Sequence, residues 1–373
     1  MSSVLHEISQ HGTSIWLDDL SRERLISGGS SRALSELISQ DSVVGVTTNP
    51  AIFSSAISNS PLYRGDIATL AQRGLSVEEI ITDLTCADVT AACDLFTETH
   101  QRSRGVDGRV SIEVDPRFAR NTEATISQAR ELWQRINRAN LLIKVPATME
   151  GLPAIRQLIS EGISVNVTII FSVSRYRQVL DSYISGLEDR LARGLPVSDI
   201  HSVASFFVSR VDTEIDSRLR SGGHASSNSS KSLEGRAALA NARLAYQHFQ
   251  EISSSTRWRK LFELGALPQR PLWASTGVKD PAYAPGMYVT ELIAPETVNT
   301  MPEATLVAVK ESGSKIRESI TEHFNSSHQT IAELAGIGID IEEVALKLEN
   351  EGIEKFTKPW LQLIDTVAKA SNS

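Results

Sequence analysis

The chain has 373 residues, with 37 Lys and Arg against 45 Asp and Glu, and its formal net charge is −8 at pH 7. This acidic balance argues against a nucleic-acid-binding surface, because phosphate backbones attract clustered basic side chains. No apolar run approaches the roughly 20 residues that a membrane-spanning helix needs. The first ten residues lack the basic and apolar regions of a secretory signal, so we expect a cytoplasmic protein without membrane contacts.

Short apolar runs alternate with longer amphipathic segments along the chain. Each run is rich in Val, Ile, Leu or Phe and is flanked by turn residues, which is typical of a buried parallel strand. The runs cover residues 15–20, 43–49, 109–115, 141–146, 163–171, 202–208, 271–276 and 287–293. Helical spacing of apolar residues follows at 32–38, 77–96, 122–136, 152–159 and 173–191.

Eight strands that alternate with helices predict a (β/α)8 barrel, forming a single domain over residues 1–373. A doubly wound open sheet is the alternative, which the eightfold count and the missing GxGxxG and GxxxxGKS/T motifs disfavour. We expect an insertion at 211–269 between the sixth and seventh strands, with helices at 212–220 and 233–252 and a mobile Gly/Ser-rich stretch at 221–231.

The remaining C-terminal sequence exceeds eight strand-helix units. A helix is predicted over 302–324, where Pro and Glu stand in the first turn. A helical extension is expected over 325–373, packed on the barrel, with helices at 341–350 and 358–369.

The cysteines and histidines lack the spacing of a metal or redox site. Cys86 and Cys93 lie seven residues apart in a helical pattern, which excludes a disulfide framework and predicts core positions. The eight histidines form no HxH or HExxH motif. We therefore expect no metal.

Polar residues stand near the carboxyl end of nearly every predicted strand. They are Asp18, Asn49, Glu113, Lys144, Asn166, Thr168, Ser205 and Ser275. In a (β/α)8 barrel these strand ends form the active site. Because side chains two residues apart share a face of a strand, Asn166 and Thr168 are expected to point the same way. The pattern predicts a single polar mouth.

Lys144 lies within the apolar run Leu-Leu-Ile-Lys-Val-Pro and is expected to be buried. Burial favours the neutral, nucleophilic amine, which suits a Schiff base with a carbonyl substrate. An ion pair with Glu113 or Asp18 is the alternative, because a buried lysine needs a partner or a role. Without such a pair, the carboxylates of Asp18 and Glu113 would transfer protons. A second alternative for each is that it caps the helix that follows its strand.

Two cations follow late strands, Arg210 after the sixth and Lys279 after the seventh. Loops in this part of a (β/α)8 barrel commonly bind phosphate, so these cations and Ser275 predict an anion site. The alternative is that both are surface cations paired with Asp212 and Asp280.

Four segments in order resemble the transaldolase family, in its longer bacterial form. They are Gly-Val-Thr-Thr-Asn-Pro-Ala-Ile-Phe at 45–53, Ser-Ile-Glu-Val-Asp at 111–115, Leu-Ile-Lys-Val-Pro at 142–146 and Gly-Ile-Ser-Val-Asn-Val-Thr at 162–168. The resemblance implies transfer of dihydroxyacetone from sedoheptulose 7-phosphate or fructose 6-phosphate to glyceraldehyde 3-phosphate or erythrose 4-phosphate. This reaction of the non-oxidative pentose phosphate pathway needs no cofactor. The expected partners are small sugar phosphates, and the expected state is a monomer or homodimer.

The resemblance also implies roles by position. Lys144 matches the Schiff-base lysine, Asp18 the acid/base at the C4 hydroxyl, and Glu113 with Thr168 the pair that holds the water of imine chemistry. By position, Asn49, Asn166 and Ser205 match residues that bind the dihydroxyacetone hydroxyls. Arg210 and Ser275 match residues that bind phosphate. Shorter members have a second arginine where this chain has Gly277, and Lys279 is expected to replace it. A lysine supplies a point charge without the bidentate fork of arginine.

Two other functions stay open. One is a lyase of the fructose-6-phosphate aldolase type, which releases free dihydroxyacetone. Such lyases are shorter and typically have another residue at the position of Glu113, so transfer is favoured. The other is a catalytically silent phosphosugar-binding protein, against which Lys144, Asp18 and Glu113 together argue.

Overall fold

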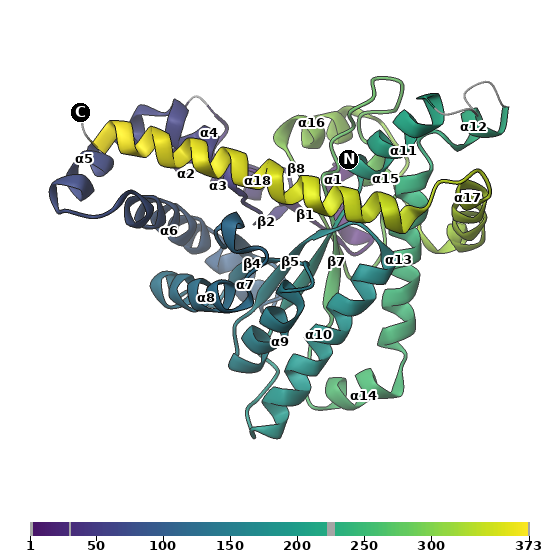
Figure 1. The fold of residues 1–373 in the computed structure, drawn as a ribbon, viewed down its shortest axis with the longest axis horizontal. Coiled ribbons are helices and arrows are strands. Elements are labelled where there is room, and N and C mark those ends of the chain that lie inside the picture. The colour runs from purple at the N-terminus through teal and green to yellow at the C-terminus, as the bar shows by residue number, and fades with distance from the viewer. Residues whose placement is uncertain (1–2, 30, 222–227, 372–373) are drawn as a thin grey trace.

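The fold is a closed barrel of parallel strands surrounded by helices (Figure 1). The computed structural model describes residues 3–29, 31–221 and 228–371. Within these ranges eight strands pair in chain order, and the last pairs with the first. They are β1 (Thr13–Leu17), β2 (Val43–Val46), β3 (Arg109–Glu113), β4 (Leu141–Pro146), β5 (Val165–Ile170), β6 (Ser202–Phe207), β7 (Gln269–Ala274) and β8 (Thr297–Met301). The predicted (β/α)8 architecture is confirmed.

Helices join the strands and cover the outside of the barrel. Up to β6 they are α1 (Val4–Gln10), α2 (Arg22–Leu25), α3 (Leu34–Gln40), α4 (Pro50–Asn59), η1 (Pro61–Tyr63), α5 (Arg64–Gln72), α6 (Val77–Leu95), α7 (Thr97–Arg102), η2 (Pro116–Phe118), α8 (Thr122–Ile136), α9 (Gly151–Glu161) and α10 (Val173–Ala192). After β6 they are α11 (Ser209–Ser221), α12 (Asn228–Leu233), α13 (Ala237–Ser253), α14 (Thr256–Glu263), α15 (Met287–Thr290), α16 (Glu303–Glu311), η3 (Thr321–His323), α17 (Phe324–Gly336) and α18 (Ile341–Ser371).

Local sequence signals explain where these helices begin and end. In α8, the Asn121 side chain accepts a hydrogen bond from the Ala124 amide, and Asn137 ends the helix with a left-handed φ of 46°. The predicted bounds of α8 are confirmed. Cys86 and Cys93 are buried on α6, which confirms their predicted core positions.

The eighth strand is β8, so the prediction of a strand at 287–293 is wrong. Residues 287–290 form α15, whose Tyr288 and Val289 are buried against the core. β8 itself is rich in polar residues, some of whose side chains donate hydrogen bonds to backbone carbonyls of the barrel. Thr297 Oγ1 donates to the Ala294 carbonyl (2.7 Å), and Asn299 Nδ2 donates to the Tyr288 carbonyl (3.1 Å). A strand of this kind gives no apolar run.

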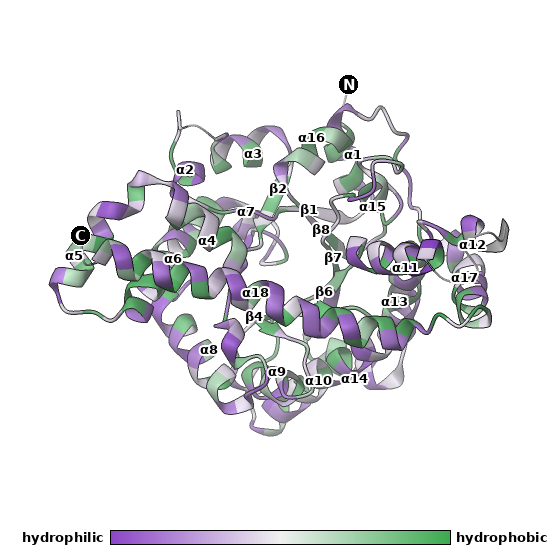
Figure 2. Cartoon of the chain, turned by 45° about the horizontal axis from the view of Figure 1, so that its top comes forward, coloured by the Kyte–Doolittle hydropathy of each residue, from purple (hydrophilic) through white to green (hydrophobic). Residues whose placement is uncertain are grey.

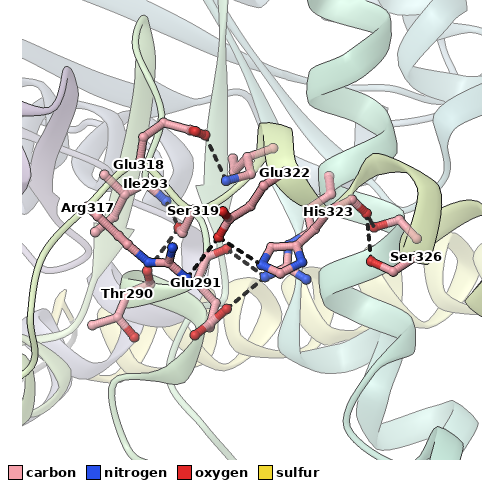
Figure 3. Close-up of polar contacts among 12 residues, drawn as sticks. Thr290, Glu291, Ile293, Arg317, Glu318, Ser319, Glu322, His323 and Ser326 are labelled. Atoms are coloured by element: carbon pink, nitrogen blue, oxygen red, sulfur yellow. Dashed lines mark hydrogen bonds and ion pairs between the residues drawn. The ribbon is translucent and has the colours of Figure 1, made fainter.

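The helix predicted over 302–324 ends as α16 at Glu311. The segment that follows is bound instead to the residues around α15, as Figure 3 shows. Ser319 Oγ donates to the Thr290 carbonyl (3.0 Å) and accepts from the Ile293 amide (3.0 Å). These bonds hold residue 319 in a segment that is not helical.

The two helices predicted at 341–350 and 358–369 are one helix, α18. Its buried side is continuous because buried residues recur every three or four positions: Val344, Leu348, Gly352, Phe356, Trp360, Leu363 and Val367. Pro359 lies inside this helix without ending it. Figures 1 and 2 show α18 running across one end of the barrel, where it contacts β5 and helices α4, α5, α6 and α11.

Helices α11 to α14 occupy the segment between β6 and β7. The helices predicted at 212–220 and 233–252 correspond to α11 and α13, but α13 begins at Ala237. Within the predicted mobile stretch, residues 222–227 lie outside the described residues. No helix in the described ranges is long and apolar enough to cross a membrane.

Candidate active site

A cleft of about 200 Å³ lies where the carboxyl ends of the strands meet beneath α18. Its lining includes predicted site residues from six places in the barrel: Asp18, Asn49, Lys144, Ser205, Arg210, Ser275 and Lys279. The other predicted residues, Glu113, Asn166 and Thr168, are buried beside them on β3 and β5. The predicted polar mouth is therefore present.

Lys144 stands at the base of this cleft. The strand register places it between Glu113 on β3 and Asn166 on β5. Only 4% of the residue is exposed. Its Nζ donates to the Thr48 carbonyl (3.0 Å) and lies 3.2 Å from Glu113 Oε2. The ion pair considered as the alternative is thus present, and the same amine also faces the cleft.

Asp18 follows β1 and is held by a chain of hydroxyls. Thr47 Oγ1 donates to Asp18 Oδ1 (2.8 Å), and Thr300 Oγ1 lies 2.7 Å from Thr47 Oγ1. Burial raises the pKa of the Asp18 carboxyl above its usual value, against the opposing charge of Lys144. Ser21 caps α2, so the helix-capping alternative for Asp18 is wrong.

Glu113 and Thr168 contribute buried oxygen atoms whose hydrogen-bonding capacity the described residues leave largely unused. Glu113 Oε2 has the Lys144 ammonium beside it (3.2 Å), whereas Glu113 Oε1 and Thr168 Oγ1 have no partner among the described residues. Burial raises the pKa of Glu113, although the neighbouring Lys144 ammonium acts in the opposite direction. Buried polar atoms without protein partners are uncommon and often mark positions of water or ligand.

Three polar residues have side chains that are partly committed to the fold. Asn49 Oδ1 accepts from the amides of Ala51 and Ile52 (both 3.0 Å) as the cap of α4, while the residue lines the cleft. Ser205 Oγ donates to Asn166 Oδ1 (2.7 Å). These contacts fix the orientation of groups suited to binding hydroxyls.

Arg210 is a half-buried cation at the start of α11. Its guanidinium lies 5.2 Å from the ring centre of Phe207 and 6.0 Å from that of Phe356. Nη1 is buried without a hydrogen-bond partner among the described residues, and burial lowers the pKa of the guanidinium. The alternative pairing with Asp212 is wrong, because Asp212 accepts from Tyr288 Oη (2.7 Å) and the Ala238 amide (2.8 Å).

The loop after β7 brings Ser275 and Lys279 to the same cleft. Ser275 has a left-handed φ of 56°, and its Oγ lies 3.0 Å from Ser209 Oγ. A Cβ at Gly277 would lie 4.0 Å from Lys279 Nζ and 3.3 Å from Thr305 Oγ1. The Lys279 ammonium therefore lies where a side chain at position 277 would extend. Asp280 pairs with Arg220 (2.9 Å), which contradicts the alternative pairing with Lys279.

A family model and individual relatives of this chain indicate the same family. The model of the transaldolase/fructose-6-phosphate aldolase family matches residues 15–367. The chain belongs to this family. The transaldolase of Mycolicibacterium smegmatis is 55% identical over 361 residues, which cover 97% of this chain and 95% of the relative. The transaldolase of Renibacterium salmoninarum is 52% identical over 373 residues, covering 100% and 98%. That of Thermobifida fusca is 50% identical over 369 residues, covering 99% and 98%.

The family resemblance inferred from the four motifs is confirmed, but the sequence reasoning missed some residues of the transaldolase-family cleft. Phe207 lies two residues after Ser205, shares its face of β6 and lines the cleft, but an apolar side chain in a strand gives no signal of a functional position. Thr300 was missed because the eighth strand was misplaced. Phe356 was missed because the predicted extension had a gap at 351–357, where α18 is continuous.

Proposed function

We propose that this chain transfers a dihydroxyacetone unit from a ketose phosphate to an aldose phosphate through a Schiff base on Lys144. The observation that carries the proposal is a buried lysine whose amine faces a polar cleft and has a carboxylate 3.2 Å away. Membership of the family, and relatives named transaldolase at about half identity over nearly the full length, support the reaction class.

The first step is imine formation. The Lys144 amine attacks the C2 carbonyl of the ketose, and Glu113 takes a proton from the amine. The carbinolamine then loses water to give the protonated imine. Glu113 Oε1 and Thr168 Oγ1, which are buried without a partner among the described residues, are suited to hold that water and to return it for hydrolysis.

The second step breaks the C3–C4 bond. Asp18 removes the proton of the C4 hydroxyl, the aldehyde leaves, and the electron pair moves into the iminium to give an enamine. A carboxylate with a raised pKa is a stronger base than an ordinary aspartate, which suits this step. The enamine then attacks the acceptor aldehyde, and Asp18 returns the proton. Because the protonated imine is the electron sink, we propose that no metal or cofactor takes part.

Substrate binding follows the arrangement of the remaining polar groups. Asn49, Asn166 and Ser205 bind the hydroxyls of the three-carbon unit. Arg210, Ser275 and Lys279 bind the phosphate, with the unpaired Arg210 guanidinium as the main anchor. Sedoheptulose 7-phosphate and fructose 6-phosphate are the proposed donors, and glyceraldehyde 3-phosphate and erythrose 4-phosphate the acceptors. We place this reaction in the cytoplasm, in the pentose phosphate pathway, and propose a monomer or homodimer.

Borohydride trapping tests the nucleophile. The protein is reduced in the presence of fructose 6-phosphate and analysed by intact mass and peptide mapping. A reduced dihydroxyacetone adduct is expected on Lys144, and none is expected in Lys144→Ala. Lys355→Ala, which changes an exposed lysine of α18, is the matched control and retains the adduct. An adduct on another lysine, or catalytic turnover without an adduct, would overturn the assignment.

The acceptor distinguishes the transferase from the lyase. With fructose 6-phosphate and erythrose 4-phosphate together, the transferase forms sedoheptulose 7-phosphate. A lyase instead releases free dihydroxyacetone at a rate that the acceptor does not change. A folded protein with neither product would favour the silent phosphosugar-binding alternative.

A further inference from the structure

A second cavity, of about 420 Å³, lies at the opposite end of the barrel from Lys144. Its wall is formed at the amino ends of the strands by residues such as Ser14, Arg109, Ser202 and Arg270. Helix α14, which carries Phe262 to its mouth, lies at the end of the barrel away from α18 (Figure 1). The cavity is therefore separate from the proposed catalytic cleft.

Arg109 is a buried cation without a carboxylate partner. The residue is 2% exposed. Within the described part of the chain its guanidinium donates to the carbonyls of Gly105 (2.7 Å) and Ala139 (3.4 Å) and forms no ion pair. Burial and the charge of Arg270 lower the pKa of Arg109 to about 9, so it is still protonated at neutral pH. A buried unpaired charge is costly unless something compensates it.

The other charged groups of the cavity leave this excess positive charge in place. Arg270 donates to Ser14 Oγ (2.9 Å) and pairs with Asp107 (3.1 Å), so one carboxylate faces two guanidinium groups. Glu296 also lines the cavity, but it is exposed to solvent. Burial lowers the pKa of His201 to about 2, so its ring is neutral and adds hydrogen-bonding capacity without charge.

The side chains of His201 and Arg109 lie close together beside Gly105. A Cβ built on Gly105 would lie 3.0 Å from His201 Nε2 and 3.4 Å from Arg109 Nη2, so both nitrogens border the same backbone position. The cavity lining also includes the apolar residues Leu267, Pro268 and Phe262, and Phe262 is 62% exposed. Charged and hydrogen-bonding nitrogens together with apolar lining residues are typical of a site for an organic anion.

We propose that this cavity binds a small organic oxyanion, a carboxylate or a phosphate ester with an apolar body. Arg109 supplies the charge, Arg270 and His201 supply further donors, and the apolar body packs against Phe262. Arg210 in the catalytic cleft likewise forms no ion pair among the described residues and has a buried nitrogen, Nη1, and it is the residue proposed to bind the substrate phosphate. The cavity holds the ligand by non-covalent contacts alone.

Calorimetric titration of the full-length chain with phenyl phosphate tests the site. Arg210→Met removes the competing phosphate position in the catalytic cleft, so the titrations use this background. One binding event is expected to remain. Adding Arg109→Gln should weaken it about 10- to 100-fold, because a charge-assisted pair is lost. Benzoate in place of phenyl phosphate distinguishes a carboxylate site from a phosphate ester site, and the neutral benzyl alcohol should not bind.

A pair of exposed variants keeps the test independent of folding. Phe262→Ala should weaken phenyl phosphate binding about two- to fivefold while leaving inorganic phosphate unchanged. Leu264→Ala, which truncates an equally exposed residue beyond the cavity lining, should change neither. Loss of all phenyl phosphate binding in Arg210→Met would overturn the proposal. So would equal binding of benzyl alcohol, or an unchanged affinity in both Arg109→Gln and Phe262→Ala.

Discussion

The buried charged side chains of this barrel are compensated in different ways. Lys144 has Glu113 at 3.2 Å, whereas Arg210 forms no ion pair among the described residues, and its guanidinium lies near the rings of Phe207 and Phe356. A lysine that shares its proton with a neighbouring carboxylate can act as a nucleophile. An arginine without a carboxylate partner keeps its charge for a ligand. The difference in pairing thus matches the two proposed roles, Lys144 as the nucleophile and Arg210 as the group that binds the substrate phosphate.

Glu113→Gln is expected to lower kcat about 10²- to 10⁴-fold, because the amide keeps the shape of the side chain but cannot take a proton from Lys144. Rates of borohydride trapping should fall in parallel. Glu349→Gln is the matched control, since Glu349 is also buried and also lies 3.2 Å from its cation, Arg175, but outside the cleft. Equal losses in the two variants would indicate that the ion pair is structural.

Asp212 gives a prediction about stability and pH. Burial raises its pKa to about 7 from the ordinary 3.8. The folded state therefore binds a proton more tightly than the unfolded state, so this carboxyl stabilises most below pH 3.8 and its contribution is lost as the pH rises toward 7. The loss is at most about 4 kcal/mol. The stability of Asp212→Asn relative to the wild type should accordingly increase between pH 4 and 8.

Urea unfolding at several pH values measures this difference. Asp365→Asn, at an exposed site of α18, serves as the control and should keep a constant difference from the wild type. A constant difference in Asp212→Asn as well would contradict the raised pKa.

At the residue level, much of the site is predictable from sequence because strand ends converge in a barrel. Lys144 is conspicuous as a charge within an apolar run. The state of its partners is not predictable in the same way. Arg210 does not pair with Asp212 because the Asp212 carboxylate accepts a hydrogen bond from Tyr288, which lies 76 positions after Asp212 in the sequence.

Helix α18 contributes Phe356 to the cleft, so we expect this helix to affect substrate binding. Its ring centre lies 5.6 Å from Lys144 Nζ and 6.0 Å from the Arg210 guanidinium. Phe356→Leu keeps an apolar side chain but removes the ring face, which is worth about 1 kcal/mol. We expect KM for the sugar phosphate to rise about fivefold and the share of free dihydroxyacetone among the products to increase.

Steady-state kinetics with product analysis provide both measurements. Leu361→Ala, an exposed position of the same helix, controls for changes in α18 and should leave both quantities unchanged. Unchanged KM and product ratio in Phe356→Leu would show that α18 does not act on the substrate.

Elements differ in how clearly their sequences predict them. The strand with Lys144 is otherwise apolar and its bounds follow from the sequence, as do those of α8. β8 is difficult to predict from sequence because it contains polar residues. The side chains of Thr297 and Asn299 donate hydrogen bonds to residues outside the strand. The continuity of α18 is hidden because Pro359 suggests an end, whereas tertiary packing of Phe356 and Leu363 holds the helix together.

For the whole molecule, we propose one domain over residues 1–373, in which 211–269 is an insertion and 325–373 packs on the barrel. A single domain should unfold in one transition. Tryptophans report on each part: Trp16 in β1, Trp258 in α14 and Trp360 in α18. Single-tryptophan variants at these positions are expected to give coincident urea midpoints. A separate transition at a lower urea concentration, reported by Trp258 or Trp360, would show that this part of the chain unfolds as a separate unit.

Closure of the barrel has a consequence for synthesis on the ribosome. Thr13 in β1 contacts Thr297 in β8, its partner 284 residues later. At roughly 5–20 residues per second, β1 waits roughly 15–55 s for that partner, with one edge unpaired. Helix α18, which carries Phe356, emerges after both. A nascent chain thus exposes an open sheet edge for most of its translation, which is the period when chaperone contact would matter most.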